Sequence, residues 1–331
     1  MDMTFSTKPV IFGFLAFFAL FYAIGVYWSF YPDLMDVRKT VSQEAQAKNE
    51  IPVVGYTTTT TLIKVAETLL DKPGGYLSND AFPPSVFLDN MPAWEFGVLE
   101  MTRDLALVMR KDFSRSQSQS LVNKHLQDAQ PRFNIDSKSW VVPSAESEYA
   151  EAIESLYKYR TALVQVGLKD KSQFYARADN LKSYIEEVQK RLGSYSHRLS
   201  ASVGIQQVNI DLAGEKNAKQ STYSASELEL KTSWWLLDDV FYEARGASWA
   251  LVHFLKAIEI DFDSVLKNKN AKISLQQIIK ELEASQEILW SPMVLNGDGF
   301  GVLANHSLVM ANYISRANAA LIDLNKLLTE G

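Results

Sequence analysis

The sequence has no cysteine among its 331 residues and only four histidines. Without cysteine the chain cannot form a disulfide framework, a thiolate metal site or a thiol nucleophile. None of the histidines stands in the H-E-x-x-H or E-x-x-H spacing of metal sites on helices. The sequence therefore predicts no metal and no cofactor. We interpret His253, which lies beside an apolar helical face, as a hydrogen-bonded core residue.

The sequence also lacks a basic stripe, a run of alternating strands and a local nucleophile motif. Its net charge of −6 is spread along the chain, so nucleic acid is not an expected partner. The motif G-x-S-x-G does not occur. The turn at 296–299 hints at a calcium loop, but Phe300 and Ser307 stand where an EF-hand needs an oxygen ligand and a bidentate glutamate. Apolar residues instead recur every three or four positions, which predicts an all-α fold.

No charged side chain occurs between Lys8 and Asp33. A helix rises about 1.5 Å per residue, so this run is long enough to cross a hydrocarbon core about 30 Å thick. Its far end is aromatic, as expected of rings at the depth of the lipid headgroups. A cleaved signal peptide is the alternative, because Ala23 and Gly25 loosely fit a cleavage site. The apolar run continues past Gly25 into bulky aromatic residues, which favours an uncleaved anchor over residues 9–32.

This anchor divides the chain into unequal parts. We expect a short cytoplasmic tail (1–8), a juxtamembrane stalk (33–60) and a helical periplasmic domain (61–331), with a possible subdomain boundary at 204–222. The stalk ends in the run Thr57–Thr61, and threonines are poor helix formers because they branch at Cβ. Positive charges flanking the anchor are nearly balanced and do not fix its orientation. The short tail before it and the large domain after it suggest that the domain is outside.

Apolar periodicity predicts an elongated multi-helix bundle after the anchor. The most strongly patterned segment is 226–266, whereas 170–203 predicts a long polar helix with a narrow apolar seam. The aromatic and proline-rich segment 76–92 is too apolar for a free linker, so we expect it to pack against the bundle. The predicted helices cover residues 62–71, 92–112, 117–129, 144–166, 170–203, 226–266, 272–290 and 302–328.

A pair of carboxylates is the candidate catalytic site. Asp239 and Glu243 share one helical face at i, i+4 spacing, close to the adjacent Trp234 and Trp235. Aromatic rings beside two acids are typical of a cleft that cleaves glycosidic bonds. Acids on a helix are more often a solvated face or ion-pair partners, and that interpretation stays open.

Two polar segments are candidates for partner binding. In residues 112–120, Ser114 or Ser116 caps the following helix, or the segment is a recognition loop in which Arg115 meets a carboxylate or phosphate. The second candidate is the glycine-rich turn at 296–301 with the helix start after it, where Asn305 and His306 have capping or packing as the alternative role. The candidate partner-binding residues are Arg115, Ser116, Gln117, Asn296, Asp298, Asn305 and His306.

Several long stretches are similar to one known family. They read LDNMPAWEFG (88–97), RKDFSRSQSQS (110–120), SWVVPSAESEY (139–149), FYEARGASWAL (241–251) and LNGDGFGVLANHSLVMANYISRAN (295–318). They resemble a family of proteobacterial inner-membrane proteins known as domain of unknown function 2333. The resemblance covers nearly the whole chain, and it implies a Gram-negative envelope protein with a periplasmic domain. It implies no activity, substrate or catalytic residue.

The anchor and the resemblance together predict a single-pass protein of the bacterial inner membrane with most of its chain in the periplasm. We expect it to be an envelope scaffold or adaptor that holds a protein partner, or a second copy of itself, at the membrane. The alternative is an enzyme that acts on envelope glycan or lipid through Asp239 and Glu243.

Overall fold

The structure is a computed structural model that describes residues 8–116, 121–165, 171–208, 227–291, 293–298 and 301–330. These residues are mostly helical, which confirms the all-α prediction and the apolar helix near the N-terminus. In chain order the elements are α1 (Lys8–Trp28), α2 (Val37–Lys48), α3 (Tyr56–Asp71), η1 (Ser85–Phe87), α4 (Asn90–Val108), η2 (Met109–Phe113), α5 (Lys124–Phe133), α6 (Ala145–Val164), α7 (Ala178–Ser200), β1 (Ile205–Val208), β2 (Glu227–Leu230), η3 (Trp234–Leu236), α8 (Leu237–Asp261), α9 (Asp263–Asn268), α10 (Lys272–Ala284) and α11 (His306–Glu330).

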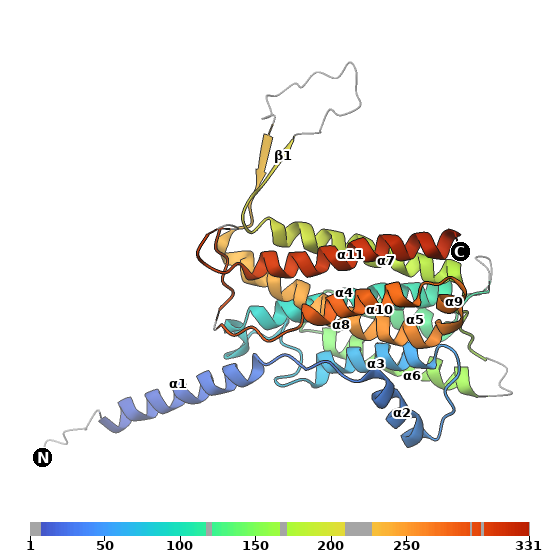
Figure 1. Ribbon diagram of the computed structural model, residues 1–331. Coiled ribbons are helices and arrows are strands. Elements are labelled where there is room, and N and C mark those ends of the chain that lie inside the picture. The colour runs from blue at the N-terminus through green and yellow to red at the C-terminus, as the bar shows by residue number, and fades with distance from the viewer. Residues whose placement is uncertain are drawn as a thin grey trace, which may run out of the picture.

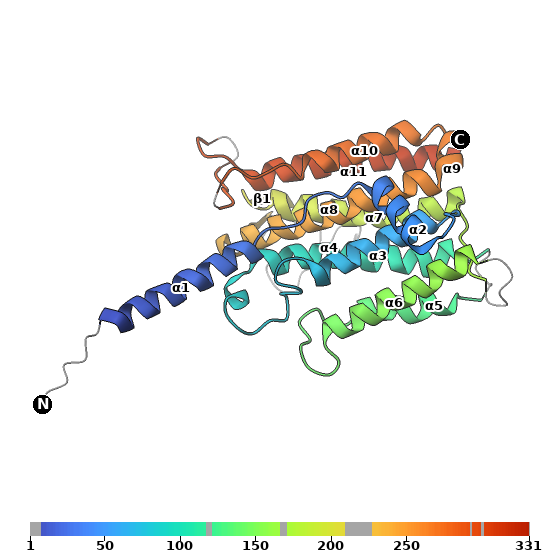
Figure 2. The same ribbon diagram turned by 90° about the horizontal axis from the view of Figure 1, so that it is seen from below.

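Most of the helices after α1 run along the long axis of an elongated bundle (Figures 1 and 2). Helix α1 leaves the bundle at one of its two ends and projects away from it, and we call this the anchor end. The opposite end is the distal end. The anchor end comprises residues 72–92, 134–144, 201–208, 227–236, 285–291, 293–298 and 301–305, and the distal end comprises 49–55, 109–116, 121–123, 171–177 and 262–271.

Helix α8 is the centre of the bundle, with buried side chains on every face. Most of these buried positions carry apolar side chains, which explains the strong apolar pattern of this segment. Helix α4 crosses α8 where each carries a glycine. A Cβ atom on Gly246 would lie 2.0 Å from the carbonyl oxygen of Trp94, and one on Gly97 would lie 2.0 Å from that of Glu243. The two backbones therefore touch at this crossing.

Residues 33–60 do not form the polar stalk that we expected. Asp36 caps helix α2 by accepting a hydrogen bond from the backbone N–H of Lys39. Along α2, Val37, Val41 and Ala45 are buried and lie one turn apart on the face that packs on the bundle. Because this stripe is narrow and the rest of α2 is mostly polar, the segment resembles a linker in sequence although it is part of the fold.

The threonine run lies inside helix α3 and is buried, so the expectation that it stands outside a helix was wrong. The hydroxyl of Thr59 donates a hydrogen bond to the carbonyl of Gly55. The backbone N–H and the hydroxyl of Thr58 both donate to the Asp261 carboxylate at 2.7 Å. Asp261 is buried at the end of α8 and acts as a cap for the first turn of α3. Tertiary contacts thus outweigh the weak intrinsic helix propensity of threonine.

The segment that follows α1 is fastened to the bundle. Trp28 packs on the core beside Gly74, and the ring of Tyr31 lies 4.7 Å from the buried guanidinium of Arg245. The backbone N–H of Met35 donates to Nε2 of His253 at 2.9 Å. His253 is fully buried, and burial lowers its pKa to about 4, which confirms its interpretation as a hydrogen-bonded core residue.

A buried ion pair fastens the anchor end. The ammonium of Lys72 lies 2.5 Å from the Glu95 carboxylate, and both side chains are fully buried. Glu95 also accepts hydrogen bonds from the backbone N–H groups of Leu77 and Ser78, each at 2.8 Å. Burial raises the pKa of Glu95 although Lys72 lies beside it. The pair and these hydrogen bonds hold the start of segment 76–92 against α4.

Two departures from the predicted elements concern α7 and the segment after it. The predicted helix 170–203 is shorter, because residues 171–177 are not helical and the apolar seam begins at Ala178. Beyond α7 the chain forms the antiparallel ribbon of β1 and β2, which the sequence did not predict. The possible boundary at 204–222 overlaps β1, and its part from 209 onward lies outside the described residues.

Candidate functional site

The residues selected from the sequence divide between the two ends of the bundle. The acids Asp239 and Glu243 lie on the first turns of α8, at the anchor end. The turn from Asn296 to His306 lies at the same end, whereas Arg115 and Ser116 lie at the distal end. Gln117 is outside the described residues. The structure therefore does not bring the two partner-binding segments together.

Glu243 is held in a two-point ion pair. Both of its carboxylate oxygens accept hydrogen bonds from the Arg198 guanidinium on α7, each at 2.6 Å. Such a bidentate pair occupies the oxygens that a catalytic acid would need. Sequence reasoning identified the acid but could not identify an arginine on another helix as its partner. This geometry supports the ion-pair interpretation of Glu243.

Asp239 is half-buried and does not have such a partner among the described residues. Burial, followed by the nearby carboxylate of Asp238, raises the pKa of Asp239 to about 6. The adjacent Trp234 and Trp235 pack edge to face on each other, with ring centroids 4.9 Å apart, and both are exposed. The paired-acid cleft stays a prediction. The ion pair of Glu243 with Arg198 argues against it.

The turn from Asn296 to His306 uses its polar groups internally. Asn305 caps α11 by accepting from the backbone N–H of Leu308 at 2.9 Å, and its amide donates to the carbonyl of Gly297. Nδ1 of His306 accepts from the backbone N–H of Leu295 at 2.8 Å. The capping and packing interpretation of Asn305 and His306 is therefore confirmed.

At the distal end, the cap of the helix after residues 112–120 is not a serine. Helix α5 begins at Lys124, and Asn123 is its cap, since its side chain accepts from the N–H groups of His125 and Leu126. The prediction that Ser114 or Ser116 caps this helix was wrong, because the helix begins later than its apolar pattern suggested. The carbonyl of Ser116 accepts from the Arg177 guanidinium at 2.6 Å, which ties the segment to the start of α7.

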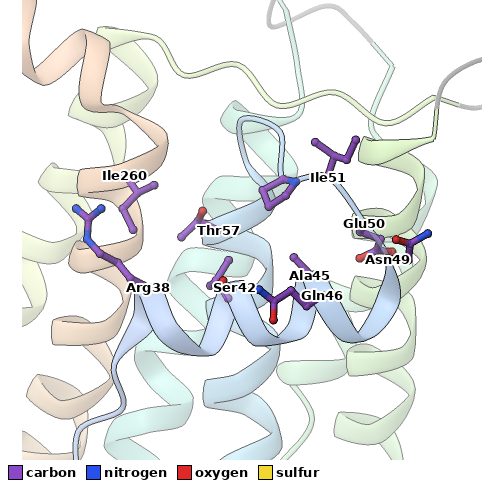
Figure 3. Close-up of a pocket in the computed structure, with 11 residues that line it drawn as sticks. Arg38, Ser42, Ala45, Gln46, Asn49, Glu50, Ile51, Thr57 and Ile260 are labelled. Carbon is purple, nitrogen blue, oxygen red and sulfur yellow. The ribbon is translucent and has the colours of Figure 1, made fainter.

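A groove of about 510 Å³ lies beside α2, toward the distal end (Figure 3). Helix α2 forms one wall, the loop that carries Ile51 forms another, and Thr57 and Ile260 lie between them. The groove has an apolar floor and a polar rim, and Ile51 beside it is 81% exposed. Its lining residues are Arg38, Val41, Ser42, Ala45, Gln46, Asn49, Glu50, Ile51, Pro52, Thr57 and Ile260.

The wall of this groove is held rigidly by a buried arginine. Arg160 on α6 is almost fully buried, and its guanidinium lies 3.2 Å from Glu44 and 3.3 Å from Glu50. It also lies 5.1 Å from the ring of Tyr56, whose hydroxyl donates to Glu50 at 2.8 Å. Burial raises the pKa of Tyr56, so it stays a hydrogen-bond donor. These contacts join α2, α3 and α6 beneath the groove.

The sequence did not predict this groove because residues 33–60 resembled a stalk. The available signal was the spacing of Val37, Val41 and Ala45 after the capping residue Asp36. Within the described ranges, no group of three or more His, Cys, Asp or Glu side chains could hold a metal ion. The groove is thus the concave surface that the structure adds to the candidates from the sequence.

Comparison with known proteins agrees with the resemblance found in the sequence. Residues 4–331 match the model of a family described as an uncharacterized protein conserved in bacteria (DUF2333), and the chain belongs to this family. No curated protein and no solved structure matched the chain.

Proposed function

We propose that this member of the DUF2333 family is a membrane-anchored adaptor of the bacterial inner membrane. Helix α1 crosses the bilayer, the bundle stands in the periplasm, and the groove beside α2 binds an apolar segment of a protein partner. The observation that carries the proposal is the position of this groove, which lies toward the end of the bundle opposite α1 (Figures 1 and 3).

The membrane placement is supported by the exposure of α1. The stretch from Ile11 to Trp28 is long and apolar enough to cross a membrane, and almost none of it is buried against the bundle. Phe12, Phe14 and Phe18 are exposed side chains that would be costly to hydrate. A hydrocarbon core provides the solvent that these side chains require.

The groove has the chemistry of a peptide-binding surface. Val41, Ala45 and Ile260 offer apolar contact at its floor, and Arg38 and Glu50 at its rim provide one charge of each sign. Small ligands and peptide side chains bind in such concave apolar sites, where a few polar groups fix their orientation. The occupant that we expect is therefore a short apolar segment with a polar edge, presented by another protein.

The bundle would hold this groove well away from the bilayer. Helix α8 has 25 residues and extends from the anchor end to the distal end. At about 1.5 Å per residue it spans roughly 37 Å. A partner bound toward the distal end would thus be kept roughly 37 Å from the lipid headgroups. The bundle would then serve as a spacer as well as an anchor.

A matched pair of glutamines on α2 provides the test. Gln46 lines the groove, whereas Gln43 is also exposed on the same helix but does not line it. A photo-crosslinking amino acid at position 46 of the full chain, expressed in bacteria, should give a discrete adduct with one protein that position 43 does not give. The substitution Ser42→Arg, which fills the groove, should abolish the adduct, and the exposed Gln43→Arg should leave it unchanged.

Two results would count against the proposal. Equal adducts from positions 43 and 46, or an adduct that survives Ser42→Arg, would show that the groove does not select a partner. A compartment-sensitive reporter fused to the C-terminus tests the orientation separately, and activity of a cytoplasmic reporter would refute the periplasmic placement without affecting the groove.

A further inference from the structure

The loops of the anchor end carry an unusual set of exposed apolar side chains. Trp290 is 93% exposed, Val142 is 96% exposed and Trp235 is 78% exposed. The loops come from separate parts of the chain and all lie at the end of the bundle where α1 leaves it (Figures 1 and 2). We call these side chains the anchor-end tips, and they are Phe82, Val86, Phe87, Trp140, Val141, Val142, Trp234, Trp235, Leu236, Ile288, Trp290, Met293, Val302 and Leu303.

The distribution of tryptophan makes this set distinctive. The chain has seven tryptophans. Trp28, Trp94 and Trp249 pack into the core, and the remaining four are anchor-end tips. Exposed apolar patches of this kind mark binding surfaces, and tryptophan in particular is enriched where a protein meets the interface of a bilayer.

The position of α1 fixes the level of these tips relative to a membrane. An apolar groove of about 900 Å³ lies between α1 and the loop that contains η1. One wall is formed by Phe17, Phe21 and Tyr22 of α1, and the other includes Phe82 and Phe87. If α1 is embedded up to its aromatic end, the tips of this loop are at the depth of lipid and not of water.

We propose that the anchor-end tips insert into the leaflet in which α1 ends, so that the bundle rests on the bilayer surface through several loops as well as through its anchor. This inference rests on the proposed crossing of the membrane by α1. The occupant of the apolar surface is the bilayer itself, because the loop with η1 shares an apolar groove with α1 and the other loops lie at the end of the bundle from which α1 projects (Figure 2).

The charges of the same loops specify which kind of lipid contact this is. Among the described residues of these loops, the exposed acids include Asp80, Asp89, Asp136, Glu287 and Asp298, whereas the basic residues are Lys138, Lys231 and Lys72, and Lys72 is buried in its ion pair. A basic surface would bind anionic headgroups electrostatically, and this surface would not. The contact is therefore an apolar insertion that needs no anionic lipid, and it should not weaken at high salt.

The absence of cysteine allows a direct measurement of depth on the full chain. Single-cysteine variants Val142→Cys, Trp235→Cys and Trp290→Cys place an environment-sensitive fluorophore at the tips. Phe14→Cys on α1 reports the crossing of the membrane, and Ile51→Cys, which is also exposed but distal, is the matched control. Each labelled protein is reconstituted in vesicles of zwitterionic phosphatidylcholine, with and without nitroxide-labelled lipid, and with iodide as the aqueous quencher.

The expected result is lipid-borne quenching at the tips that is several-fold stronger than at position 51 and not weakened by high salt. Strong quenching at position 14 with quenching at the tips no greater than at position 51 would overturn the inference and leave the anchor intact. Absence of quenching at position 14 would refute the anchor itself. Tips shielded from both lipid nitroxide and iodide would be covered by protein, either a second copy or a partner, which would also overturn the inference.

Discussion

Replacing Gly246 by alanine should destabilise the bundle, because α4 and α8 cross in backbone contact at this point. The new Cβ would lie 2.0 Å from the carbonyl oxygen of Trp94, whereas ordinary contacts begin at 3.4 Å. The two helices would have to separate by roughly 1.4 Å, and overpacking of this kind costs about 3 kcal/mol at the upper end of its usual range. The better helix propensity of alanine returns about 1 kcal/mol.

The expected net loss in the free energy of unfolding is thus about 2 kcal/mol, or a fall of about 3 °C in the midpoint of thermal unfolding for a chain of this size. Circular dichroism of the full chain in detergent micelles measures it. The matched control is Gly193→Ala on α7, where the new Cβ would be 3.7 Å from Asn318, an ordinary contact. That variant should melt at or above the wild-type temperature. Equal melting of Gly246→Ala and Gly193→Ala would refute the close helix crossing.

Three further predictions follow from buried polar groups. Lys72→Met leaves the buried Glu95 carboxylate without a cation to pair with and should cost about 3 kcal/mol at neutral pH, and most of this loss should return when Glu95→Gln is added, as measured by urea unfolding. The raised pKa of Asp239, about 6, means that its protonated form favours the folded state, so stability is lost as the pH rises through this value. Asp239→Asn should therefore raise the free energy of unfolding above pH 6 by about 1 kcal/mol after allowance for solvent screening, and urea unfolding should show this gain vanish as the pH falls. Asp261→Ala removes the acceptor for two groups of Thr58 and should cost about 2 kcal/mol, whereas Asp261→Asn, which keeps one acceptor oxygen, should cost less, and any reversal of that order would contradict the capping role.

The parts of the fold that were predictable are those whose environment is uniform along the element. Helix α1 is apolar along its length after Lys8 and almost none of it is buried, and α8 carries apolar side chains at most of its buried positions. In both cases the local sequence contains the whole signal. Helices α6 and α11 were also close to their predicted bounds, since each buries one continuous face.

The segment between α1 and α3 could not be predicted in the same way. The threonine run of α3 is helical because Asp261, which is 203 positions away from Thr58, accepts its hydrogen bonds. Helix α2 is held by Arg160, which is 116 positions away from Glu44. Pairings over such separations exist only once the bundle has formed, and no local pattern reports them.

The candidate sites show the same limit. The polar residues chosen from the sequence were unusual in composition, but Asn305 and Glu243 use their polar groups to cap a helix and to pair with Arg198. The surfaces that the structure adds are apolar and exposed. Segment 76–92, which we expected to pack against the bundle, does so at Tyr76 and Leu77 but exposes Phe82 and Phe87. Apolar side chains in a sequence do not tell which of them face outward.

The packed connection after α1 has a mechanical consequence. Trp28, Tyr31 and Met35 fix the chain to the bundle within a few residues of the end of α1, so no flexible linker separates α1 from the bundle. If α1 crosses the bilayer as proposed, the bundle tilts together with α1. Helices adjust their tilt to bilayer thickness, and a change of about 10° would swing a point roughly 40 Å away sideways by about 7 Å. A partner held beside α2 would sense the thickness and tension of the membrane through that displacement.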